Sequence, residues 1–83
     1  MNVDGSKYKC YLFDLGFYIK ERALKAKEER NKEIPNTPGY EFQCGRIIAF
    51  NEVISIMQQC AKGFDIPLQD LNMKDIEPDR DFT

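Results

Sequence analysis

The spacing of apolar residues between positions 40 and 64 constrains the fold more than any other feature of this sequence. Apolar side chains recur there at steps of three and four, at Ile47, Phe50, Ile54, Met57, Ala61 and Phe64. This spacing places them on one face of an α-helix and is typical of helix–helix packing. A second apolar stripe lies beside the first and consists of Ile48, Val53, Ile56 and Cys60. We therefore predict a helix over residues 40–62 with a wide apolar face.

The same periodicity predicts a first helix over residues 7–32. Its main stripe, again with steps of three or four, consists of Tyr8, Leu12, Leu15, Ile19, Ala23 and Ala26. The second half of this segment contains strong helix formers with opposite charges four residues apart, such as Glu21 and Lys25. Gly16 lies within the helix and lowers its stability by about 1 kcal/mol relative to alanine. Close approach of another backbone and a mild kink are both consistent with a glycine here.

The two predicted helices are joined by a loop over residues 33–39. Residues 31–39 contain two prolines, two asparagines and one glycine, which is a composition typical of loops. A short connection between long helices favours an antiparallel hairpin. The tail, residues 63–83, is expected to pack along this hairpin through Ile66, Leu68, Leu71, Met73 and Ile76. The sequence thus predicts one all-α domain over residues 1–83.

Both predicted helices carry more apolar surface than a single neighbouring helix covers. A chain of 83 residues also has a marginal core when it stands alone. We therefore expect the hairpin to dimerise into a four-helix bundle, which is favoured over a monomer covered by its own tail. The expected core and interface residues of this bundle are Leu12, Leu15, Ile19, Ile47, Phe50, Ile54 and Met57.

The composition argues against most kinds of catalytic chemistry. The sequence has no histidine, which excludes histidine-based acid–base catalysis and histidine metal sites. It also lacks a phosphate-binding loop and a nucleotide fingerprint, so we expect no enzyme, no cofactor and no metal site. No apolar run approaches the ~20 residues that span a bilayer. Three widely spaced cysteines and the lack of a signal peptide indicate a reduced, cytoplasmic protein without membrane contact.

These observations favour a non-enzymatic protein–protein interaction or regulatory module that binds itself and an unidentified protein partner. A nucleic-acid-binding regulator is the first alternative, although the net charge of -2 and interleaved glutamates weaken it. Its basic face would consist of Lys20, Arg22, Lys25, Lys27, Arg30 and Lys32. A small-molecule or catalytic pocket near Arg46, with Glu52 as a second polar group, is the other alternative. In a helical bundle such polar residues more often fix the register of the helices.

One resemblance supports the predicted architecture. The run from Gly45 to Gln59, GRIIAFNEVISIMQQ, is followed by Phe64-Asp65-Ile66-Pro67 and by a terminal Pro78-Asp79-Arg80-Asp81. This pattern resembles a group of small uncharacterised bacterial proteins, more closely over residues 40–83 than over the first helix. The resemblance implies a helical hairpin with no known activity, and it assigns no functional residues.

Overall fold

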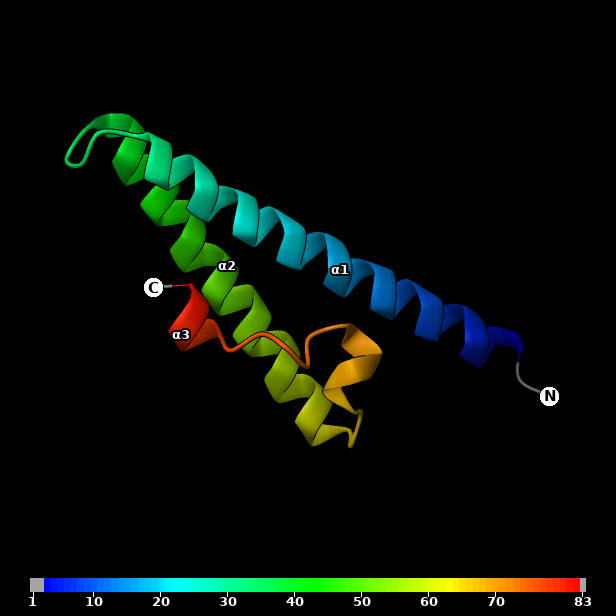
Figure 1. The fold of residues 1–83 in the computed structure, drawn as a ribbon. Coiled ribbons are helices and arrows are strands. Elements are labelled where there is room, and N and C mark those ends of the chain that lie inside the picture. Colours follow the sequence, from blue (N-terminus) through cyan, green and yellow to red (C-terminus); the bar gives the residue numbers. More distant parts are fainter. Residues whose placement is uncertain (1–2, 83) are drawn as a thin grey trace.

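The computed structural model describes residues 3–82 and is all-helical (Figure 1). Two long antiparallel helices, α1 (Val3–Lys32) and α2 (Pro38–Gly63), pack against each other. The tail adds a short 3-10 helix, η1 (Leu68–Leu71), and a single helical turn, α3 (Pro78–Asp81). No strand occurs among residues 3–82. The predicted all-α hairpin is therefore confirmed, although α1 begins four residues before the predicted start at residue 7.

The turn between the helices is fixed by a cap at the start of α2. The Thr37 hydroxyl oxygen accepts a hydrogen bond from the Tyr40 backbone N–H at 3.3 Å, and the same hydroxyl donates to the Ile34 carbonyl at 2.7 Å. Pro38 follows directly and occupies the first helical position, where its missing N–H has no cost. Because Thr37 caps the helix, α2 begins two residues before the predicted residue 40.

The helices diverge away from this turn, and η1 lies between their separated ends, whereas α3 lies beside the middle of α2 (Figure 1). η1 packs against α1, and α3 packs against α2. A Cβ atom added at Gly16 would overlap the backbone carbonyl of Leu71, so η1 approaches α1 closely only because residue 16 is glycine. Close approach of another backbone is thus the observed reason for this glycine.

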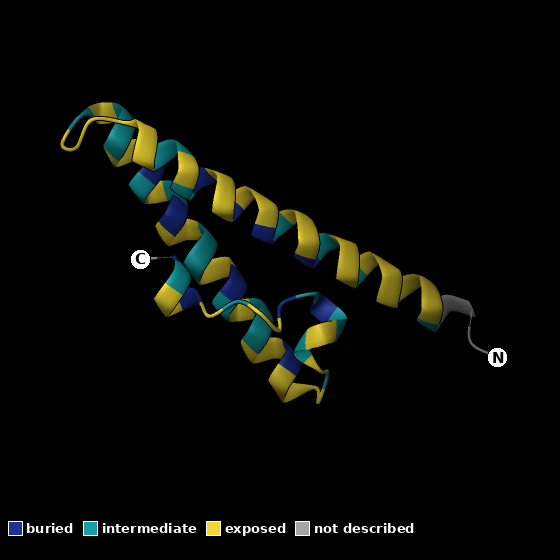
Figure 2. Cartoon of the chain, viewed as in Figure 1, coloured by how far each residue is buried: buried dark blue, intermediate teal, exposed yellow. Residues whose placement is uncertain are grey.

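The core is built from both long helices and from the tail (Figure 2). Its fully buried apolar residues are Ala23, Ala26, Ile47, Ile54, Ala61, Leu71, Met73 and Phe82. The last three belong to the tail, which therefore covers the inner face of the hairpin. Phe82 has no exposed surface, although it lies in an acidic stretch that gave no sign of a core residue.

The residues expected at the centre of a dimer lie at different depths in the single chain. Ile47 and Ile54 are fully buried, with 1% and 0% of their surface exposed. Four others are half-buried and pack against the core, namely Leu12, Ile19, Phe50 and Met57. Leu15 is half-buried and does not belong to that set. Ile47 and Ile54 are thus buried within the single chain, whereas the other five expected residues are covered only in part.

Two amide side chains of α2 hold the tail by its backbone. The Asn51 Nδ2 group donates to the carbonyl oxygens of Pro78 and Phe82 at 2.9 and 3.0 Å. Two turns further along α2, the Gln58 Nε2 group donates to the Ile76 carbonyl at 3.0 Å. Buried polar groups require such partners, so these two side chains hold the tail by binding its backbone carbonyl groups.

One charged pair joins the tail to α1, and a second pair lies within the tail. Lys20 is 9% exposed, and its Nζ donates to Asp75 at 2.9 Å, which lowers the pKa of the Asp75 carboxyl group. Within the last turn, Arg80 donates to the Asp81 carboxylate, which also accepts the Glu77 N–H at 2.9 Å. These contacts lower the pKa of Asp81 to about 2. The acidic tail is therefore docked on the hairpin.

Candidate interaction surfaces

Exposed tyrosines mark the N-terminal half of α1, which extends past the rest of the molecule (Figure 1). Tyr8, Tyr11 and Tyr18 are 69%, 66% and 51% exposed. They lie on one side of the helix, because the steps between them through Leu15 are three, four and three residues. We call these three side chains the tyrosine stripe. Each offers a flat apolar ring and a hydroxyl group, a combination that is enriched at protein interfaces.

Phenylalanines occupy another side of the same half of α1. Phe13 and Phe17 are each 45% exposed, and the Phe17 ring meets the Tyr18 ring edge-on with centroids 5.3 Å apart. Phe13 lines a shallow groove against Gln69 and Asp70 of η1. The N-terminal half of α1 therefore exposes aromatic side chains on two sides, while a third side contacts the tail.

One exposed side of α2 is occupied mainly by apolar residues. We call this surface the outer face of α2, and its exposed residues are Phe42, Gly45, Ala49, Val53, Ile56, Cys60 and Gly63. Phe42 and Ile56 are 64% and 59% exposed. Two charged residues flank this stripe, Glu52 at one edge and Arg46 at the other. A solvent-facing helix surface normally carries many charges, so this face has the composition of a contact surface.

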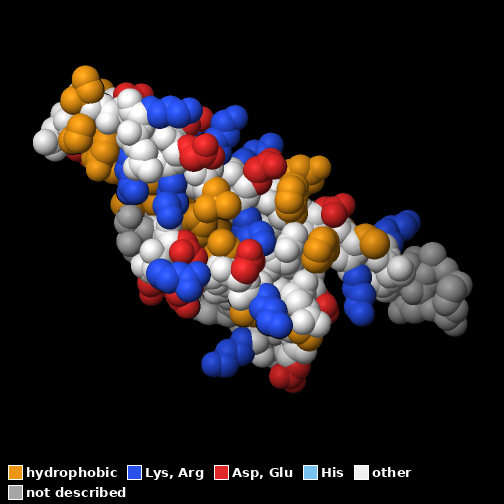
Figure 3. Space-filling model, viewed as in Figure 1, with side chains coloured by type: hydrophobic (Ala, Val, Ile, Leu, Met, Phe, Trp, Pro, Cys, Tyr) orange, Lys and Arg blue, Asp and Glu red, His pale blue; other side chains and the backbone are white. Residues whose placement is uncertain are grey.

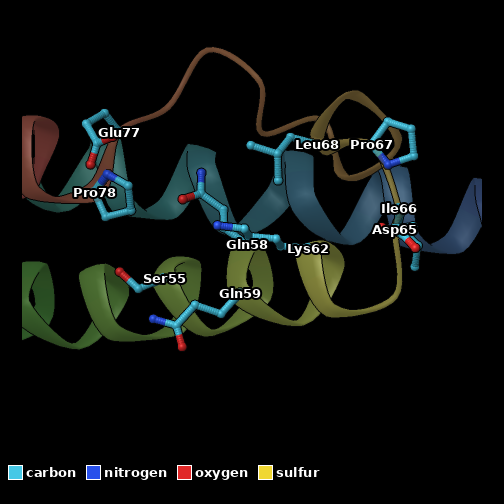
Figure 4. A pocket seen from close by; sticks show the side chains of 10 residues that line it. All are labelled: Ser55, Gln58, Gln59, Lys62, Asp65, Ile66, Pro67, Leu68, Glu77 and Pro78. Carbon is cyan, nitrogen blue, oxygen red and sulfur yellow. The ribbon is translucent and has the colours of Figure 1, made fainter.

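A groove of about 570 Å³ lies between the second half of α2 and the tail (Figure 4). Ser55 and Gln59 of α2 line one wall, and Pro67 and Pro78 lie toward its two ends. The remaining lining residues are Gln58, Lys62, Asp65, Ile66, Leu68 and Glu77. The apolar surface with amide groups at its edge suits an apolar segment of another molecule. Its wall of Ser55 and Gln59 adjoins the outer face of α2.

Arg46 and Glu52, the two residues of the possible polar cluster, lie on different sides of α2 within one chain. Six residues at about 100° each place the two side chains roughly 120° apart around α2. Arg46 instead donates to the Gln43 side-chain oxygen at 2.8 Å, and Gln43 in turn donates to Glu29 of α1 at 3.5 Å. Arg46 thus supports the contact between the two helices, and the groove with Ser55 and Gln59 lies elsewhere on α2.

The predicted basic face of α1 is divided by the docked tail. Lys20 is buried against Asp75, and the Lys27 ammonium group lies 5.8 Å from the centre of the Phe82 ring. Basic and acidic side chains alternate along the visible face of α1 (Figure 3). Two of the six bases therefore fasten the tail, which leaves a weaker field for nucleic acid than the sequence suggested.

Residues 3–82 contain no group of three acidic or cysteine side chains placed to hold a metal ion. None of the helices described is long and apolar enough to cross a membrane. Comparison with known proteins gave no further guide: no family model, no curated protein and no solved structure matches this chain.

Proposed function

We propose that this protein is a non-enzymatic, homodimeric interaction module that binds a partner protein through the tyrosine stripe of α1. The observation that carries the proposal is the exposure of Tyr8, Tyr11 and Tyr18 on one side of a projecting helix end. The stability of α1 does not require aromatic residues at these positions, because good helix formers without rings serve equally well.

Tyrosine has a specific physical advantage in binding. Its ring buries a large area on contact, while only two side-chain torsions become fixed, so the entropy lost is small. The hydroxyl group stays compatible with water in the free protein and finds a hydrogen-bond partner in the complex. Three such side chains along the first half of α1 suit an apolar groove with a polar rim on the partner.

The homodimeric part of the proposal is supported by the outer face of α2, which remains apolar after the tail has docked. A cytoplasmic location fits the same proposal, since Cys10, Cys44 and Cys60 are all free thiols. The lack of histidine supports the non-enzymatic part.

Affinity capture from the native host tests partner binding directly. The bait is the full chain, either as wild type or with Tyr8, Tyr11 and Tyr18 all replaced by serine. A matched control carries Ile34→Ser and Phe64→Ser, because these side chains are 72% and 78% exposed and lie outside the tyrosine stripe. Circular dichroism verifies that each bait retains its helices.

The expected result is one stoichiometric protein partner that the wild type and the control recover and that the stripe variant loses. Equal recovery by the stripe variant would place partner binding elsewhere. Capture of nucleic acid alone would favour the nucleic-acid alternative, provided that salt elutes it and that a bait with Lys25→Glu and Arg30→Glu fails to bind it. A co-purifying small molecule without a protein partner would contradict the proposal as well.

A further inference from the structure

The outer face of α2 combines small residues with larger ones on the two sides of one point. Gly45 and Ala49 lie before the midpoint between Glu52 and Val53, and Ile56 and Cys60 lie after it. No atom lies within 4 Å of the position that a Cβ would take at Gly45, so this half is open to an incoming side chain. The opposite half presents Ile56, which is 59% exposed.

The two halves match each other in spacing. Ala49 and Ile56 are equally far from the midpoint, and the same holds for Gly45 and Cys60. Further out, Phe42 and Gly63 are also equidistant, and the position of a Cβ at Gly63 is open too. Each small residue therefore has a larger counterpart at the same distance on the other side of one point.

We propose that two copies of this chain pack through the outer faces of their α2 helices, antiparallel, about a twofold axis between Glu52 and Val53. This inference rests on the homodimeric part of the proposed function and names its interface. The second copy then places Ile56 on Ala49 and Cys60 on Gly45. Successive residues of a helix are turned by about 100° around its axis. The two members of each pair therefore lie on opposite sides of the centre line of the stripe, so that their side chains can interlock.

A parallel pair of helices would lack this match. Glycine would then face glycine and leave a gap, whereas Ile56 would meet its own copy and force the helices apart. In the antiparallel pair the small residues allow the axes to approach to about 8 Å. The hairpin itself does not obstruct this contact, because α1 packs on the opposite side of α2 against Ile47, Ile54 and Ala61.

The interface is narrow, since it uses one helix from each copy. The stripe from Phe42 to Cys60 is about 27 Å long at ~1.5 Å per residue. A contact of this size is smaller than the roughly 1,600 Å² of a standard complex, so we expect dissociation in the micromolar range. Two Glu52 side chains lie near the twofold axis, at the edge of the contact, and repel each other there.

Disulfide trapping of the full chain tests the register. All variants carry Cys10→Ser, Cys44→Ser and Cys60→Ala, so that no native thiol remains. In this background, Val53→Cys places the thiols of the two copies next to each other across the twofold axis. Phe42→Cys lies on the same face, but antiparallel packing separates the two thiols by about 32 Å. Lys25→Cys on α1 is exposed and serves as a control for random collision.

Mild oxidation is expected to cross-link Val53→Cys rapidly and the other two variants at the slow rate of collision. Equal cross-linking of Phe42→Cys would indicate parallel packing and overturn the inference. A mixture of wild type with Glu52→Lys is expected to form more heterodimer than random pairing gives, because opposite charges then meet at the axis. Random pairing in that mixture would also count against the register.

Light scattering of the wild type separates this inference from the broader proposal. If the wild type is a dimer and Val53→Cys fails to cross-link, only the α2 interface is wrong. If the wild type is a monomer at every concentration, the homodimeric part of the proposed function fails as well. Binding of a partner by the tyrosine stripe is measured independently of both outcomes.

Discussion

Replacement of Gly16 by alanine reports on the closest contact between the tail and the hairpin. In an exposed helix this change stabilises by about 0.5–1 kcal/mol, because alanine is the better helix former. At Gly16 the new methyl group would overlap the Leu71 carbonyl, a backbone group that cannot rotate away. We therefore expect η1 to move off α1 and to loosen the packing of Leu71 and Met73, which are 3% and 0% exposed.

The magnitude follows from the burial that is lost. Each such side chain contributes about 1.5–3 kcal/mol when fully buried. Partial loss of both, less the gain in helix propensity, gives an expected destabilisation of about 2–4 kcal/mol for Gly16→Ala. Urea unfolding followed by circular dichroism measures this difference, at protein concentrations low enough that the transition does not depend on concentration.

Gly45→Ala is the matched control, because no atom lies within 4 Å of the added methyl group. It is expected to raise the free energy of unfolding of the monomer by up to about 1 kcal/mol. If Gly16→Ala is as stable as Gly45→Ala, the tail does not contact α1 in the way described, and the reasoning from Leu71 is refuted.

Two further predictions concern the end of the tail. Phe82→Ala is expected to lower the free energy of unfolding by about 3–5 kcal/mol, since the ring is fully buried. Phe64 is 78% exposed, so Phe64→Ala should change this free energy by less than about 0.5 kcal/mol. Thermal unfolding compares them, and similar stability of both variants would mean that Phe82 is not a core residue. Arg80 and the Glu77 N–H lower the pKa of Asp81 to about 2. Its carboxylate therefore stabilises the folded chain above about pH 4, and this contribution is lost as the pH falls through about 2. Asp81→Asn should therefore lose less stability than the wild type between pH 5 and pH 2, and an equal loss in urea titrations at these pH values would contradict the assignment.

The two long helices were predictable because their apolar residues follow steps of three and four over many turns. The loop was predictable because Pro35 and Asn36 interrupt that pattern, although Pro38 and Gly39, which the prediction placed in the loop, form the first turn of α2. Tail packing through Leu71 and Met73 followed from their apolar character. Each of these features depends on residues that are close together in the sequence, and a sequence pattern predicts such features most directly.

The remaining features depend on contacts between distant parts of the chain. Phe82 is a single apolar residue in an acidic stretch, so no periodicity identifies it as buried. Asn51 and Gln58 have the composition of a solvated helix face, yet they donate to carbonyl groups that the sequence leaves unplaced. Periodicity likewise identifies an apolar face without stating whether the tail or a second copy covers it.

The central claim is that the inner face of α2 is filled by the chain itself, while its outer face is exposed. Ile54 and Ile56 test it directly, because they are 0% and 59% exposed on the same helix. Far-UV circular dichroism should find Ile54→Asp unfolded, since an unpaired buried charge costs several kcal/mol, about as much as the whole stability of a small domain. The same measurement should find Ile56→Asp as helical as the wild type. Unfolding of both variants, or of neither, would contradict the claim.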